Sequence, residues 1–90
     1  MEANEISEHL YRVFAFVRDS KTWVTSKEIA VGAKVAPRTA RAHALRLVNT
    51  GLFDLAETFP SHRYRLSPKA GKRNKTFLQR LEESGKFWPV

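Results

Sequence analysis

The sequence predicts a small α+β domain that is mainly helical, and three patterns support this. Apolar residues recur at helical spacing between residues 6 and 17, a helix start signal follows at Thr25, and after Gly51 the apolar period shortens toward two. A chain of 90 residues has room for one domain. We therefore expect a single domain over residues 1–90, with its core in about residues 5–68.

The first predicted helix runs from about Glu5 to Asp19, with Asn4 as its N-cap. Its apolar residues follow one another by four, three, one and three positions, which places them on one helical face: Ile6, Leu10, Val13, Phe14 and Val17. Trp23 and Val24 then favour one short strand, because aromatic and β-branched residues suit a pleated chain.

Two further helices are expected over residues 26–33 and 37–49. Thr25 and Glu28 have the spacing of a capping box at the start of the first. Pro37 suits the first position of the next helix, so the turn between them is short. Either Lys34 takes a left-handed backbone conformation or the turn differs from the usual one, and Gly51 is placed to end the later helix in left-handed geometry.

The residues after Gly51 predict a β-hairpin and a last helix. Strands are expected over residues 52–57 and 62–66, with a turn containing Pro60 between them. A basic connection over residues 69–75, a C-terminal helix over about residues 75–84 and an apolar tail over residues 85–90 complete the prediction.

This order of elements describes a winged helix-turn-helix: helix, short strand, helix, turn, recognition helix, β-hairpin wing and C-terminal helix. The physical logic is that a helix fits the major groove of B-DNA, while the hairpin reaches the backbone or the neighbouring minor groove. Double-stranded DNA is therefore the expected partner.

The region from about Trp23 to Ala70 also resembles the winged helix-turn-helix domains of bacterial and phage regulators of the MarR, ArsR and GntR type. The end of the wing resembles their Tyr-Arg-Leu-Thr-Pro-Lys-Gly pattern in the stretch from Tyr64 to Lys69. The helix-turn-helix matches their pattern without a gap at Ile29, Ala30, Val35, Thr39, Leu47, Gly51 and Leu52. The sequence departs from these domains at Lys34, where they usually have glycine, and at Ala40 and Ala44, where they have larger aliphatic residues. The resemblance implies a DNA-binding regulator.

Charge supports a polyanionic partner. The chain has 16 basic and 9 acidic residues, a net charge of +7 and a pI near 10.3, above the value of about 9 that is typical of nucleic-acid-binding domains. The charge is uneven: residues 1–20 hold two basic and four acidic residues, whereas residues 21–50 hold six basic and one acidic. General solubility would not require one acidic end.

On the third helix, Ala40, Ala44 and Leu47 are spaced to face the core together with Val48. The opposite face carries the candidate DNA contacts Arg38, Arg41 and Ala42, with Thr39 and Arg46 beside them. An arginine can bind guanine O6 and N7 with two hydrogen bonds, and Ala42 can contact a thymine methyl. The alternative is that these arginines are a solvated helix face.

Further candidate contacts lie on either side of the recognition helix. At the start of the second helix and in the turn, Ser26, Lys27 and Lys34 are candidates to bind phosphate, since helix N-termini attract anions. At the wing the candidates are Ser61, His62 and Arg63, although His62 also suits an ordinary polar turn. The basic stretch 69–75 is either an electrostatic arm or a solvated connection.

Nothing in the sequence predicts an enzyme, a cofactor or a metal site. Cysteine is absent, and His9, His43 and His62 lie in separate elements without partners at metal-ligand spacing. His43 is expected to pack at the edge of the core. No segment has the length of a membrane helix and no small-molecule ligand is evident, so we expect a cytoplasmic protein that is nucleoid-associated when bound to DNA.

The expected function is that of a sequence-specific DNA-binding protein, a small transcriptional regulator of a phage, plasmid or other mobile element. A homodimer through the first and last helices is expected, since one domain covers one half-site. Phe87 and Trp88 would either join that interface or fold back onto the core. The alternative function is a winged-helix protein–protein interaction module in a replication or nucleoprotein complex.

Overall fold

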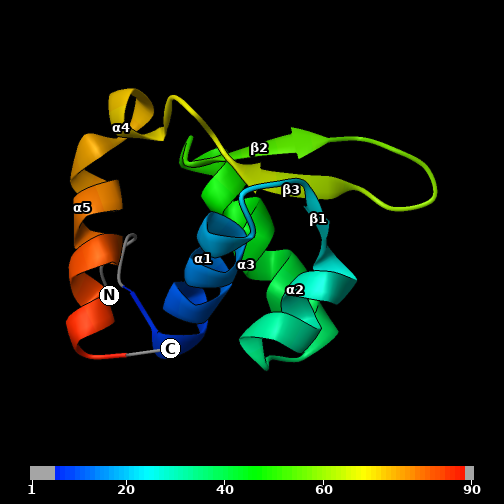
Figure 1. Ribbon diagram of the computed structural model, residues 1–90, viewed down its shortest axis with the longest axis horizontal. Helices are drawn as coiled ribbons and strands as arrows, with labels where there is room; N and C mark the ends of the chain where they lie inside the picture. Colours follow the sequence, from blue (N-terminus) through cyan, green and yellow to red (C-terminus); the bar gives the residue numbers. More distant parts are fainter. Residues whose placement is uncertain (1–5, 89–90) are drawn as a thin grey trace.

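Helix α1 (Glu8–Ser20) lies at the centre of the structure, a computed structural model that describes residues 6–88 (Figure 1). Its N-cap is Ser7, whose hydroxyl oxygen accepts a hydrogen bond of 3.1 Å from the Leu10 backbone N–H. Asn4, the predicted N-cap, lies outside the described residues, and the helix begins after Ser7 instead. The helix is central because these side chains are buried on it: Leu10, Tyr11, Val13, Phe14, Ala15 and Val17.

Helices α2 (Ser26–Ala33) and α3 (Pro37–Asn49) have the predicted bounds. The predicted capping box is present: the Glu28 N–H donates to Thr25 Oγ1 over 3.2 Å, and the Thr25 N–H donates to Glu28 Oε1 over 2.8 Å. Both helices pack against α1 and against each other.

The turn between α2 and α3 depends on Lys34, which has a φ of 58° and a ψ of 47°. The Val35 N–H donates to the Ala30 carbonyl over 3.0 Å and the Lys34 N–H to that of Val31 over 3.4 Å, which is a Schellman motif. Of the two alternatives for this turn, the structure therefore has the left-handed conformation of Lys34. Gly51, with a φ of 91°, likewise follows the end of α3 as predicted.

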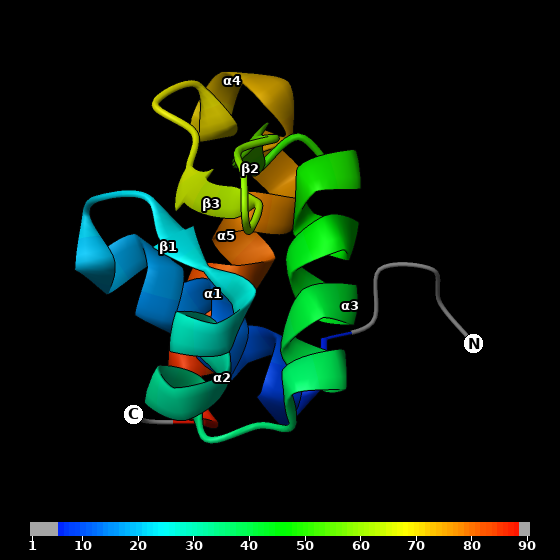
Figure 2. The same cartoon turned by 90° about the vertical axis from the view of Figure 1, so that its right-hand side faces the viewer.

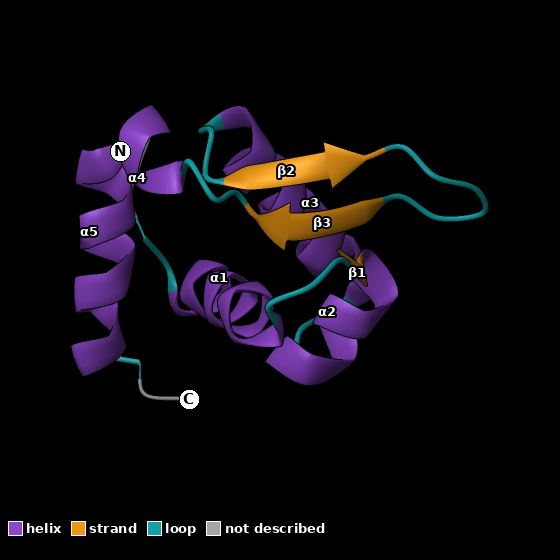
Figure 3. Cartoon of the chain, turned by 45° about the horizontal axis from the view of Figure 1, so that its top comes forward, coloured by secondary structure: helices purple, strands orange, loops and turns teal. Residues whose placement is uncertain are grey.

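Three short antiparallel strands form a sheet in the order β1-β3-β2 (Figure 3). They are β1 (Val24–Thr25), β2 (Phe53–Ala56) and β3 (Arg63–Leu66). The sheet adds a pairing that the sequence did not indicate, because Val24 lies opposite Tyr64 on the central strand. Beyond the last β2–β3 pair, Ala56 with Arg63, the wing tip (residues 57–62) projects away from the body of the protein (Figure 1).

The stretch 69–75 corrects the prediction of a basic connection, since it contains helix α4 (Ala70–Arg73). The Ser67 hydroxyl oxygen accepts a hydrogen bond of 3.0 Å from the Lys69 N–H, which turns the chain after Pro68, and Ala70 is then buried in the core. The burial of Ala70 and this hydrogen bond stabilise α4, although the apolar residues in this stretch have no helical spacing.

Asn74 separates α4 from α5 (Lys75–Glu83). Its side-chain oxygen accepts a hydrogen bond of 3.3 Å from the Phe77 N–H, and its side-chain amide donates to the Thr50 carbonyl over 3.2 Å. One residue therefore begins α5 and attaches it to the end of α3. Phe77 and Leu81 point into the core, which thus extends beyond the predicted limit at residue 68.

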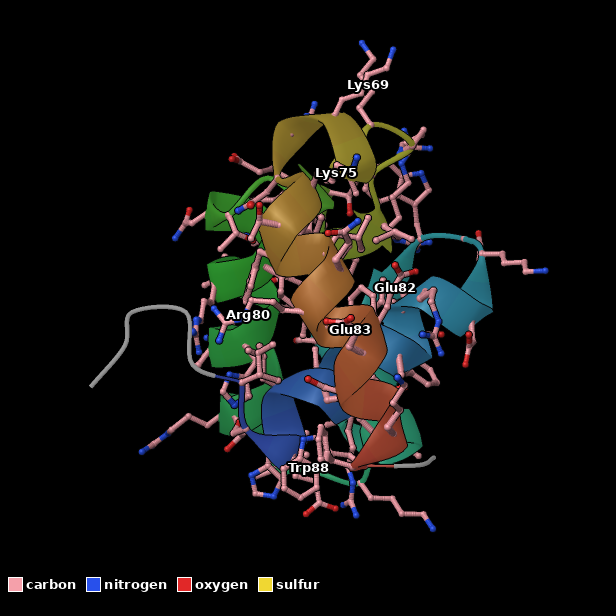
Figure 4. All side chains as sticks on the ribbon, turned by 90° about the vertical axis from the view of Figure 1, so that its left-hand side faces the viewer. Lys69, Lys75, Arg80, Glu82, Glu83 and Trp88 are labelled. Carbon is pink, nitrogen blue, oxygen red and sulfur yellow. The ribbon has the colours of Figure 1, made fainter. Side chains whose placement is uncertain are left out.

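The predicted apolar tail begins as a 3₁₀ turn, η1 (Ser84–Lys86). Trp88 is partly buried and packs against the core, whereas Phe87 is 75% exposed. The last helix and Trp88 are seen side-on in Figure 4. Pro89 and Val90 lie outside the described residues. Within residues 6–88, no helix is long and apolar enough to cross a lipid bilayer.

Candidate nucleic-acid interface

Helix α3 presents one buried face and one exposed face, as predicted. Ala40, Ala44 and Leu47 are fully buried, and Val48 is partly buried against the same core. The exposed face consists of Arg38, Arg41, Ala42, Leu45 and Asn49, with Thr39 and Arg46 half-buried at its edges. The first turn of α3 contains no acidic residue, so its exposed start is cationic.

A groove of about 500 Å³ lies between α3 and the wing. Figure 2 shows both elements from the side toward which the wing projects. Four elements, α2, α3, β2 and β3, and the wing tip supply its walls. The lining residues are Ser26, Arg41, Leu45, Leu55, Pro60, Ser61, His62 and Tyr64. No acidic side chain is among these lining residues. An anion that enters the groove would therefore meet a cation and hydroxyl groups, with no carboxylate to repel it.

Tyr64 forms the buried side of this groove and is 2% exposed. Burial raises the pKa of its phenol, and the neighbouring Arg41 cation partly opposes this rise. The phenol is therefore neutral at neutral pH. Arg41 supplies the permanent positive charge of the groove.

Of the predicted contacts, the structure brings Ser26, Arg41, Ser61 and His62 together in the groove. The remaining ones lie around it on α2, the turn, α3 and the wing. Lys27, Lys34, Arg38, Ala42 and Arg63 are exposed, and Thr39 and Arg46 are half-buried. The predicted phosphate contact at the start of α2 shares that helix end with the Glu28 carboxylate of the capping box.

Two arginines outside the predicted site are engaged within the protein. Arg65 Nε and Arg73 Nη1 each lie 3.1 Å from a different oxygen of Asp54. The Arg65 guanidinium also stacks 4.6 Å from the centre of the Trp23 ring. The two alternatives for residues 69–75, an arm or a solvated connection, both fail for Arg73, because it holds α4 against β2.

Sequence reasoning missed the apolar wall of the groove. Leu55 and Tyr64 are opposite each other in the β2–β3 register, and Pro60 closes the outer end. Tyr64 and Leu66 are two residues apart and therefore share a face of β3, but this spacing does not show that α3 leaves part of that face open. Leu45 carries a usable signal, since it follows Arg38 by seven positions and Arg41 by four and so shares their face of the helix.

His43 packs at the edge of the core, as predicted. Burial lowers the pKa of its imidazole, and the nearby charges of Arg46 and His9 lower it further. Within the part of the chain that the structure describes, no three His, Cys, Asp or Glu side chains are placed to hold a metal ion.

A helix-turn-helix, a three-stranded sheet and a projecting hairpin next to α3 define a winged helix-turn-helix fold. Solved structures share it. The chain is similar to a MarR-family transcriptional regulator from Silicibacter pomeroyi, at 18% sequence identity and a TM-score of 0.66, covering 97% of this chain and 60% of that one.

The chain is also similar to the YusO protein from Bacillus subtilis, at 15% identity and a TM-score of 0.64, covering 96% of this chain and 62% of that one. For BpsR of Bordetella bronchiseptica the identity is 11% and the TM-score 0.64, with 93% and 63% covered. At these identities the likeness confirms the predicted fold alone. The chain spans about 60% of the length of these structures. No protein-family model and no curated protein matches the sequence.

Proposed function

We propose that this protein binds double-stranded DNA, placing α3 in the major groove and the wing against the adjacent backbone or minor groove. The observation that carries the proposal is the arrangement of α3 and the wing around one groove that contains Arg41 and no carboxylate. A major groove about 12 Å wide admits an α-helix. The exposed face of α3 carries basic and neutral side chains and no acidic one.

The proposed roles differ along this surface. Arg38, Arg41 and Thr39 lie in the first turns of α3 and would contact base edges, with Ala42 allowing close approach. Lys27, Lys34, Arg46 and Arg63 would contact phosphates, and Ser26, Ser61 and His62 would donate hydrogen bonds from the groove. The negative charge of Asp54 does not oppose DNA, because two guanidinium groups neutralise it.

The first test is a titration of a random 30-base-pair duplex at low salt, followed by repeats at rising salt. Binding should occur at micromolar concentration. If about five cations neutralise phosphates, the logarithm of the affinity should fall with the logarithm of the salt concentration at a slope of about −4 to −5. Absence of binding would contradict the proposal and favour the alternative, a module that binds an acidic protein partner.

The second test is selection of bound sequences from a random duplex pool, repeated with Arg41→Ala. Relaxed preference at defined base positions is the expected result, with a loss of about 1–3 kcal/mol at those positions. Equal weakening on all sequences would instead make Arg41 a phosphate contact. Lys86→Ala is the matched control, since it removes one exposed charge in η1, away from the groove.

We propose transcriptional regulation as the biological role, on the strength of the fold; an origin in a phage, plasmid or other mobile element stays a prediction. A homodimer through the first and last helices also stays a proposal. Helix α1 offers little surface for it, because six of its side chains are buried. The exposed Phe87 beside α5 is the better support, and sedimentation velocity of wild type and Phe87→Ser tests it.

A further inference from the structure

The tip of the wing exposes a large aromatic side chain. Phe59 is 97% exposed, more than any other large apolar side chain within residues 6–88. Single exposed apolar side chains are common on protein surfaces, but aromatic rings are enriched where proteins contact partners, and this ring stands at the end of a projecting hairpin (Figure 1). The packing of the domain does not account for Phe59, because Phe59 is neither in the core nor among the partly buried residues that pack against it.

The tip that carries Phe59 is held in shape. The Thr58 hydroxyl donates a hydrogen bond of 2.6 Å to the Ser61 carbonyl, which closes the chain around residues 59 and 60. The Thr58 N–H donates to the Ala56 carbonyl over 3.0 Å. The ring is therefore presented on a short closed loop, and little conformational entropy is lost when it binds.

The position of the tip connects Phe59 with the groove described above. Pro60, Ser61 and His62 line that groove opposite Arg41, so a duplex lying on α3 also meets the wing tip. His62 in the wing tip and Arg63 next to it suit contact with a phosphate backbone, and Glu57 is the one acidic residue of the wing tip.

We infer that Phe59 is an apolar wedge that enters the minor groove of bound duplex DNA and partly unstacks a base step. This inference rests on the proposed function. Side chains of this kind that insert between base pairs bend the duplex by about 20–90°. Phe59 would then add affinity without neutralising any phosphate, and it would make the DNA bend at a fixed distance from the bases that α3 contacts.

The experiment measures affinity and bending together on one selected duplex with a donor and an acceptor dye at its ends. Wild type should shorten the distance between the dyes on binding. Phe59→Ala should lose that change and bind about 5- to 100-fold more weakly, with the same salt slope. Phe59→Leu keeps an apolar wedge and should retain most of both effects. Val31→Ala is the control, because it removes another exposed apolar side chain, 77% exposed on α2, that does not line the groove.

The outcomes separate the two proposals. If wild type does not bind the duplex, the proposed function fails. If wild type binds and Phe59→Ala binds and bends the duplex equally well, the wedge is wrong while the proposed function stands. Weaker binding by Phe59→Ala with unchanged bending also overturns the wedge, because Phe59 would then only touch the outside of the duplex. Thermal unfolding of each variant must show that the fold is retained, which is expected for a side chain this exposed.

Discussion

Asp54 joins the wing to the C-terminal part of the domain, and its removal should have a measurable cost. The carboxylate accepts hydrogen bonds of 3.1 Å from Arg65 on β3 and from Arg73 on α4. Its side chain is 22% exposed, whereas those of Arg65 and Arg73 are 40% and 46% exposed. Solvent therefore screens both pairs, and each should contribute about 0.5 kcal/mol.

Asp54→Ala also leaves the Arg65 guanidinium stacked on Trp23 without its counter-charge. We expect a total loss of about 1–1.5 kcal/mol in the free energy of unfolding. For a domain of this size, such a loss lowers the melting temperature by about 4–12 °C. Calorimetry or thermal circular dichroism measures it, and duplex binding below the melting temperature should change little.

A double-mutant cycle isolates the pair with Arg73, and we expect a coupling energy of about 0.5 kcal/mol between Asp54→Ala and Arg73→Ala. Asp19→Ala is the control, since it breaks another Arg–Asp pair, with Arg18, whose aspartate is 66% exposed. A coupling near zero, together with an Asp54→Ala melting temperature equal to wild type, would refute this view of the link between the wing and α4.

Three further changes test the backbone and the titrating groups. Lys34→Gly should stabilise the protein by about 0.5–1 kcal/mol, because glycine adopts the left-handed turn without the steric cost of a side chain; a lower denaturation midpoint would contradict this. Gly51→Ala should destabilise the protein by about 1–2 kcal/mol, since the φ of Gly51 is 91° and the new Cβ would lie 3.1 Å from Arg73 Cβ. Gly71→Ala is the control and should be nearly neutral, because its Cβ would lie at an ordinary 3.8 Å from Leu78 Cδ2. The pKa of His43 is lowered in the folded state, so the unfolded chain binds a proton first as the pH falls below the usual value of about 6.5, and stability should be lost in that window. His43→Asn should show a smaller loss of melting temperature between pH 7.5 and 5.5 than wild type, and an equal loss would contradict this reasoning.

Much of the fold could be predicted because local signals agreed. The capping box of Thr25 and Glu28, the proline at the start of α3 and the change of period after Gly51 each act within a few residues, and all three features are present in the structure. Lys34 shows how strong such constraints are: the short turn required a left-handed residue there although a lysine occupies the position.

The missed features depend on contacts between residues far apart in the sequence. Arg73 lies 19 residues from Asp54, and a run of basic residues gave no sign that one of them would be paired. Helix α4 has four residues and no apolar period, so a buried Ala70 and a hydrogen bond to Ser67 decide its existence. The groove follows from the distance between α3 and the sheet, which no single segment encodes.

Thr25 belongs to two parts of the molecule at once. It is the last residue of β1, opposite Arg63 where the paired strands of the hairpin end and the wing tip begins, and its hydroxyl is the N-cap of α2. A tilt of the hairpin would therefore have to break either a strand pairing or a helix cap. The orientation of the hairpin relative to α2 is therefore set during folding. Under the proposed function, a bound duplex would have to adapt its own curvature and groove width to that fixed spacing.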